Sequence, residues 1–180
     1  MSSSLLRRVH ERLAESGIPH ALIGAAALAI YGISRSTFDQ DLLVTDRRAL
    51  HPTIWADLGD SVAVDIRRGD DDDPLAGVVR LVSPGERDVD IVVGRHEWQR
   101  RILDEAILRD TPEGTMPVVS PEGLVLLKLY AGAPQDLWDI EQLRTVVGGP
   151  ALDPAVSHRV QSLPPQARAA WTRLTSKSDG

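Results

Sequence analysis

The sequence contains no cysteine, which excludes disulfide bonds, zinc sites with thiolate ligands and catalysis by a cysteine nucleophile. Aromatic residues make up only 4% of the 180 residues, so a stacking platform for single-stranded nucleic acid is not expected. The net charge of -6 at pH 7 argues against a broad basic surface for nucleic acid, although a local basic patch is compatible with it.

Long apolar runs are also missing. No run approaches the roughly 18 residues that a membrane-spanning helix requires. Residues 1–13 carry charges too early and too often for a signal peptide. We therefore expect a cytoplasmic protein without a membrane segment, and its length allows a sizeable hydrophobic core.

Periodic hydrophobicity predicts helices and strands in alternation, followed by a helical region. Strands are predicted over residues 20–24, 38–44, 61–68, 77–82, 88–93 and 116–119. Helices are predicted over residues 4–16, 25–31, 47–58, 98–108, 121–130, 134–148 and 153–174, the last broken by Pro164 and Pro165. This order indicates an α+β fold with a mixed β-sheet flanked by helices. We expect a core over residues 1–119 and a helical C-terminal part over 120–180 packed on it.

The stretch Leu22–Val44, LIGAAALAIYGISRSTFDQDLLV, combines a glycine turn with two carboxylates. Asp39 and Asp41 lie two positions apart on a predicted strand, so both side chains point to the same face. Side by side they repel each other unless a cation lies between them, and Mg²⁺ binds carboxylates together with substrate phosphates. Alternating acids can also mark the solvent face of an edge strand. The apolar neighbours Leu42–Val44 instead favour a buried strand with a metal site.

Gly-Ala, about a dozen residues and then Asp-x-Asp resembles the signature of the nucleotidyltransferase superfamily, which has a polymerase-beta-like fold. The run Arg35-x-Thr37-x-Asp39-x-Asp41 is similar to the AbiEii-type branch, the nucleotidyltransferase toxins of type IV toxin–antitoxin pairs. The resemblance spans roughly residues 20–148. It implies transfer of an NMP from an NTP to a hydroxyl of an RNA or tRNA end or of a protein. It also implies one or two Mg²⁺ ions held by Asp39 and Asp41, and an antitoxin protein as a partner.

A third carboxylate is predicted on a neighbouring strand. Asp90 lies in the apolar run Val89–Val93, and the resemblance implies a third acid in such a setting. This acid would share the metal and act as the general base for the acceptor hydroxyl. Asp88 on the same strand face and Asp65 on another strand are the alternatives.

Four residues near the first two aspartates are predicted to bind the nucleotide. Gly24 and Ala25 would form a turn whose backbone N–H groups meet the β- and γ-phosphates at a helix start. The family usually has Gly-Gly or Gly-Ser here, so Ala25 departs from it. Arg35 and Thr37 precede the aspartates. Arg35 contacts a triphosphate oxygen, or it is a surface residue or a partner for Asp39.

In the C-terminal part, Lys128 is a lone cation in the apolar run LVLLKLYA. Lysines in such helices often extend to water. The resemblance implies instead that Lys128 contacts the nucleotide phosphates and that Asp139 acts beside it, with Asp136 as the alternative. Trp138 between them is expected to be a core residue.

Two other functions remain open. A small-molecule nucleotidyltransferase, as in the aminoglycoside nucleotidyltransferases, suits the acidic chain because such antibiotics are cationic. An inactive relic that binds a nucleotide or a partner protein is the third, and Ala25 is the residue that points to it.

Overall fold

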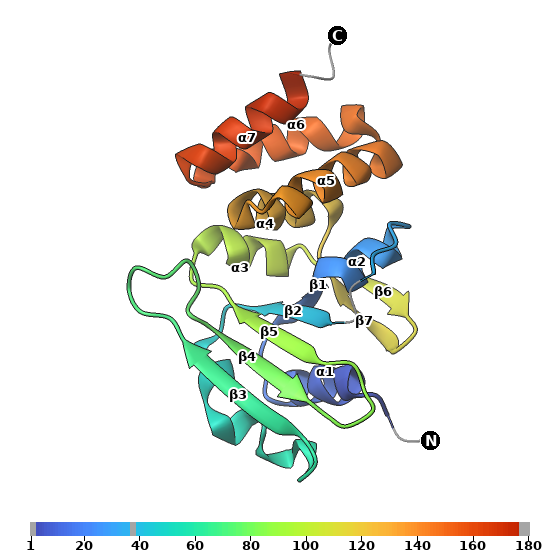
Figure 1. The fold of residues 1–180 in the computed structure, drawn as a ribbon, viewed down its shortest axis with the longest axis vertical. Helices are drawn as coiled ribbons and strands as arrows, with labels where there is room; N and C mark the ends of the chain where they lie inside the picture. Colours follow the sequence, from blue (N-terminus) through green and yellow to red (C-terminus); the bar gives the residue numbers. More distant parts are fainter. Residues whose placement is uncertain (1–2, 37–38, 177–180) are drawn as a thin grey trace. The chain divides into compact units, whose positions relative to one another are not determined.

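The structure is a computed structural model, and it describes residues 3–36 and 39–176 (Figure 1). The chain divides into two compact units. The first comprises Met1–Ile30 and Ser34–Val119, and the second comprises Tyr31–Ile33 and Ser120–Gly180. Among the described residues, no helix combines the length and the hydropathy needed to cross a bilayer.

A seven-stranded mixed sheet forms the first unit, in the order β3-β4-β5-β2-β1-β7-β6 (Figure 1). The strands are β1 (His20–Ile23), β2 (Gln40–Val44), β3 (Ala63–Arg68), β4 (Gly77–Val82), β5 (Val89–Val93), β6 (Ile107–Thr111) and β7 (Gly114–Val118). β2 and β5 are parallel neighbours, as are β1 and β7, whereas the other pairs are antiparallel. The α+β fold with a mixed sheet is therefore confirmed.

The two faces of the central strands differ in burial. Along β4 and β5, Val79, Leu81, Val89, Ile91 and Val93 are fully buried, while the residues between them are partly exposed. This period of two follows from the alternation of side chains along a strand. One face thus belongs to the core, and the other presents its polar side chains outward.

The helix α1 (Leu5–Glu15) adds an amphipathic helix to this core. Ser4 caps it by accepting a hydrogen bond from the backbone N–H of Arg7. Its buried residues are Leu5, Leu6, Val9 and Leu13, and burial of each stabilises the fold by about 2 kcal/mol. The short helix α2 (Gly24–Ile30) contains only small and aliphatic residues and packs on β1 and β2.

A histidine pair joins α1 to β1, in which His20 is buried and His10 is partly exposed. His20 Nδ1 lies 2.8 Å from the carbonyl oxygen of Ile18, which can only accept, so Nδ1 carries the proton. His20 Nε2 is therefore an acceptor, and it receives the Nδ1–H of His10 at 2.7 Å. Burial lowers the pKa of both histidines, so the neutral rings are favoured in the folded chain.

The predicted helix over 47–58 is wrong. Three short 3₁₀ helices take its place: η1 (Arg47–Leu50), η2 (Pro52–Ile54) and η3 (Ala56–Leu58). Pro52 has no N–H to donate to a continuing helix, and Gly59 with φ of 104° ends the last piece.

The predicted helix over 98–108 is shorter in the structure. α3 (Glu97–Asp104) ends at Asp104 with Glu105 as its C-cap, and residues 107–111 form the edge strand β6 instead. The pairing of β6 with β7 overrides the helical spacing of apolar residues over 98–108. A strand at the edge of a sheet can expose apolar side chains such as Leu108. β3, at the opposite edge, is also largely exposed on both faces.

Helices form the second unit. They are α4 (Pro121–Ala131), α5 (Pro134–Leu143), the π-helical turn η4 (Arg144–Gly148), α6 (Gly149–Arg159), the 3₁₀ turn η5 (Val160–Ser162) and α7 (Pro165–Ser176). Ser120 caps α4 through its side chain, with Pro121 at the first helical position. The expectation that Trp138 is a core residue is wrong. It is 46% exposed, because Ile140 and Leu143 occupy the inward face of α5.

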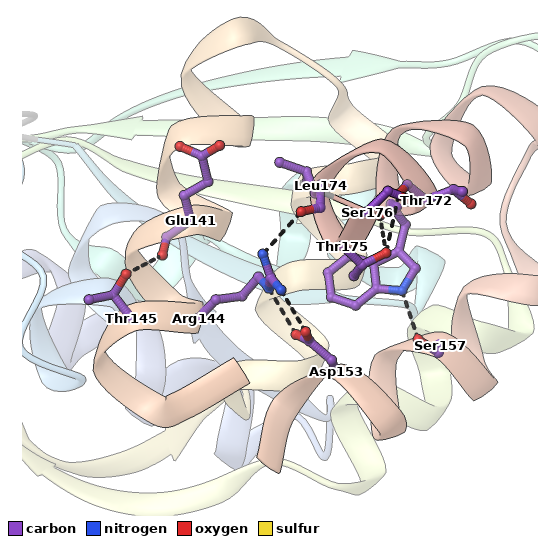
Figure 2. Close-up of polar contacts among 10 residues, drawn as sticks. Glu141, Arg144, Thr145, Asp153, Ser157, Thr172, Leu174, Thr175 and Ser176 are labelled. Carbon is purple, nitrogen blue, oxygen red and sulfur yellow. Dashed lines mark hydrogen bonds and ion pairs between the residues drawn. The ribbon is translucent and has the colours of Figure 1, made fainter. Parts of the chain in front are cut away.

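Arg144 links η4, α6 and α7 within this unit (Figure 2). Its Nε and Nη2 atoms lie 2.9 and 2.6 Å from the two carboxylate oxygens of Asp153, a bidentate pair. Its Nη1 donates to the carbonyl oxygen of Leu174 at 3.2 Å, and its guanidinium lies 5.8 Å from the ring centroid of Trp171. A cleft of about 840 Å³ opens beside this pair. Arg144 lines the cleft, but its side chain is already bonded to Asp153 and Leu174 and holds the helices together.

Candidate active site

The strand register brings the predicted carboxylates onto one face of the sheet. Asp41 on β2 is the direct neighbour of Asp90 on β5 in the parallel ladder. Asp39 and Asp88 each lie two positions earlier, at the entrance of their strands, where the N–H of Gln40 donates to the carbonyl oxygen of Asp88 at 3.0 Å. All four carboxylates therefore lie on the face opposite the core.

Arg80 joins this cluster from β4, and sequence reasoning did not find it. It is the antiparallel neighbour of Asp90. Its Nη2 lies 2.7 Å from Asp88 Oδ2 and 3.4 Å from Asp39 Oδ2, and its Nη1 lies 3.3 Å from Asp90 Oδ2. An arginine on an alternating strand carries no sign of which acids it will face, because the pairing partner depends on register.

Asp90 is the carboxylate with the least complete set of partners. Its Oδ1 atom is buried and has no hydrogen-bond partner among the described residues. Burial raises the pKa of Asp90, the Arg80 guanidinium lowers it, and the charges of Asp39 and Asp88 raise it again. Asp88, by contrast, is tightly paired with Arg80. Between the two, the orphaned oxygen favours Asp90 as the residue that takes a cation or a proton.

Asp65 is the other alternative that the sequence left open. It is the neighbour of Arg80 on β3, but it pairs with Arg67 at 3.0 Å, and both side chains are largely exposed. An exposed and paired acid has little need of a metal ion, so Asp65 is the weakest of the three.

Gly24 packs directly against Asp41. It has a left-handed φ of 63°, and a Cβ atom built on it would collide with Asp41 Oδ2. The pairing of Ile23 with Asp41 between β1 and β2 produces this close approach. A glycine is thus needed here both for the backbone angle and for the space that the carboxylate takes.

Two clefts open beside the carboxylates. One, of about 260 Å³, is lined by Asp39 together with Ala25 and Arg35. The other, of about 350 Å³, is lined by Asp90 together with Arg80, Asp65, Asp73 and Leu75 among others. Thr37, predicted to bind the nucleotide, lies outside the described residues. Of the other predicted residues of the first unit, Ala25, Arg35 and Asp39 line the first cleft and Asp90 lines the second, whereas Gly24 and Asp41 line neither.

The donor set of this cluster fits a hard divalent cation. Carboxylate oxygens are the ligands that Mg²⁺ prefers, and Asp90 Oδ1 is an orphaned oxygen that a cation would satisfy. No group of three Asp, Glu or His side chains is arranged to hold a metal ion in the part of the chain that the structure describes. Asp39, Asp88 and Asp90 contact Arg80 instead.

In the second unit, Lys128 lies between two aspartates. Its Nζ is 2.6 Å from Asp139 Oδ2 and 3.0 Å from Asp136 Oδ1. Asp139 is only 2% exposed, and Asp136 Oδ2 also accepts the N–H of Ala133 at 3.0 Å at the start of α5. Lys128 is thus held by both acids, and the two alternatives for the aspartate partner contact the same ammonium group.

No protein-family model and no curated protein matches the chain. Among solved structures, the antibiotic-resistance factor ANT(2'')-Ia in solution is similar with a TM-score of 0.54, covering 97% of this chain and 93% of that chain at 15% identity. The fold is nucleotidyltransferase-like.

Two further solved structures share this fold. The crystal structure of ANT(2'')-Ia in complex with adenylyl-2''-tobramycin gives a TM-score of 0.53, covering 87% of this chain and 95% of that chain at 14% identity. An antigenic nucleotidyltransferase-like protein from Paracoccidioides brasiliensis gives 0.52, covering 93% of this chain and 90% of that chain at 19% identity.

Proposed function

We propose that this chain is a Mg²⁺-dependent nucleotidyltransferase that transfers an NMP group from an NTP to an acceptor hydroxyl. The observation that carries the proposal is the register of β2 and β5, which makes Asp41 the neighbour of Asp90, with Asp39 on the same face. The orphaned Asp90 Oδ1 and the approach of Gly24 to Asp41 support it. The nucleotidyltransferase-like fold is consistent with it.

Each residue has a role in this proposal. Asp39, Asp41 and Asp90 hold one or two Mg²⁺ ions, which when bound supply positive charge to the triphosphate. Asp90 takes the proton of the acceptor hydroxyl, whose oxygen bonds to the α-phosphorus as the bond to the bridging oxygen of pyrophosphate breaks. A raised pKa suits Asp90 to this task.

The nucleotide is proposed to enter the cleft beside Asp39. There the Gly24–Ala25 turn and the residues Arg35 and Thr37 bind its phosphates. Lys128 keeps the nucleotide-binding role that the AbiEii resemblance implies, and Asp139 keeps the catalytic role beside it. The acceptor is proposed to enter the cleft beside Asp90, because the base must lie within hydrogen-bond reach of the hydroxyl that it deprotonates.

The Arg35-x-Thr37-x-Asp39-x-Asp41 run favours the AbiEii-type reading, with an RNA or tRNA end or a protein as acceptor and an antitoxin as partner. A small cationic acceptor is the second candidate. The acidic net charge of -6 favours it, because such acceptors are cationic. ANT(2'')-Ia, crystallised with adenylyl-2''-tobramycin, offers a fold-level parallel.

Incubation with each radiolabelled NTP, Mg²⁺ and total tRNA tests the proposal. Label on tRNA that needs Mg²⁺ and is lost in Asp41→Asn supports the transferase and identifies its acceptor class. Asp57→Asn is the matched control, because this acid is 76% exposed in its side chain and lies on η3, away from the carboxylate cluster. Full activity in Asp41→Asn would refute the proposed mechanism.

The same experiment separates the acceptors. If tRNA acquires no label but calorimetry detects NTP binding, the acceptor is a small molecule or a protein. If neither label nor NTP binding is detected, the chain is the inactive relic. An RNA acceptor should lose binding steeply as salt rises, whereas a small cation loses it more gradually.

A further inference from the structure

Arg80 contacts the carboxylate cluster at unequal distances. The contact with Asp88, at 2.7 Å, is a strong charge-assisted hydrogen bond. The contacts with Asp39 and Asp90, at 3.4 and 3.3 Å, are near the limit for a hydrogen bond. The guanidinium is therefore anchored on Asp88 and only lightly held by two of the proposed metal ligands.

A divalent cation and Arg80 compete for the same charges. A cation held by Asp39 and Asp90 would place positive charge beside the guanidinium that contacts the same two carboxylates, and the two charges would repel each other. Arg80 has space to withdraw, since its side chain is 42% exposed and lines the cleft of about 350 Å³. Asp65, its neighbour on β3, offers a second acid on that side.

We propose that Arg80 is a positioning residue that neutralises Asp39 and Asp90 until a divalent cation displaces it, while it stays attached to Asp88. The inference rests on the proposed function, since it requires the cation to bind at these carboxylates. It accounts for the convergence of the acids on Arg80 rather than on one another. Arg80 thereby weakens metal binding to the free protein, so that tight binding needs the oxygen ligands of a triphosphate as well.

Mn²⁺ binding to the full chain without nucleotide, followed by calorimetry and electron paramagnetic resonance, tests this role. We expect Arg80→Gln to bind Mn²⁺ roughly tenfold more tightly than the wild type, because a positive charge beside the ion is removed. Arg67→Gln is the matched control. It removes a positive charge from the same cleft, but Arg67 pairs with Asp65, and we expect an affinity within about twofold of wild type because exposed charges are screened.

Equal affinities of the two variants, or weaker binding by Arg80→Gln, would overturn the inference. Asp41→Asn keeps this outcome separate from failure of the proposed function. If Asp41→Asn does not weaken Mn²⁺ binding, the ion does not occupy this site and the proposed function fails as well. If it does weaken binding and Arg80→Gln does not strengthen it, only the role of Arg80 is refuted.

A measurement on the wild-type protein covers the case in which Arg80→Gln does not fold. The Nε–H resonance of Arg80, assigned by its disappearance in Arg80→Lys, is expected to shift when Mg²⁺ is added, because the guanidinium leaves Asp39 and Asp90. An unchanged resonance at saturating Mg²⁺ would show that the cation does not displace Arg80.

Discussion

Replacement of Gly24 by alanine probes the site with one added methyl group. Gly24 has φ of 63°, and the new Cβ would overlap the carboxylate of Asp41. Gly17 has the same φ of 63°, but no atom lies within 4 Å of a Cβ placed on it. The two substitutions therefore share the cost of the backbone angle and differ in the collision with Asp41.

The shared cost is about 1–2 kcal/mol, the penalty that an alanine pays in the left-handed region. We expect Gly17→Ala and Gly24→Ala to lower the free energy of unfolding by this similar amount. The collision in Gly24→Ala is relieved most easily by rotation of the Asp41 carboxylate, the far end of a short side chain. This moves Asp41 out of position, and a displacement of about 1 Å at a reacting centre can cost roughly 100-fold in rate.

Urea unfolding and the NMP-transfer assay measure the two effects separately. Gly24→Ala should lose about 100-fold in kcat while Gly17→Ala stays within about twofold of the wild type. Transfer by Gly24→Ala at the rate of Gly17→Ala would refute the reasoning, because the space taken by Asp41 would then have no part in the reaction. A much larger stability loss in Gly24→Ala would mean that the backbone moves in place of the carboxylate.

Two further predictions concern stability. Burial lowers the pKa of His10 and His20 in the folded chain, so the unfolded chain binds more protons below about pH 6.5. The free energy of unfolding should therefore fall on acidification. The slope is at most about 1.4 kcal/mol per pH unit for each proton that the unfolded chain binds and the folded chain does not. Urea unfolding between pH 5 and pH 8 checks this, and His20→Leu should flatten the dependence, whereas replacing the exposed His51 with Gln should not. Arg144→Met leaves Asp153 partly buried without its partner and should cost about 2–3 kcal/mol, less than a fully buried pair because Asp153 is 24% exposed. The double variant with Asp153→Asn should recover part of this loss, and an equal loss in both variants would contradict the role of the pair.

Local patterns in the sequence were sufficient for much of the fold. Helical spacing of apolar residues located α1, and the alternation Val89, Ile91, Val93 located β5, because these periods depend only on neighbours along the chain. The same alternation predicted that Asp39 and Asp41 share a face. Where local signals conflicted, as over residues 47–58 and 105–111, Pro52 and the pairing of β6 with β7 decided the outcome.

The composition of the candidate site was decided by tertiary structure. Nothing in the sequence near Arg80 indicates that it faces Asp39, Asp88 and Asp90, or that Gly24 meets Asp41. These contacts depend on which strands pair and in what register, and a shift of one residue would turn every side chain to the opposite face. The sequence by itself determined which acids are available. The register of β4, β5 and β2 determined which acids Arg80 contacts, and it left Asp90 with a buried oxygen that no side chain of the described residues satisfies.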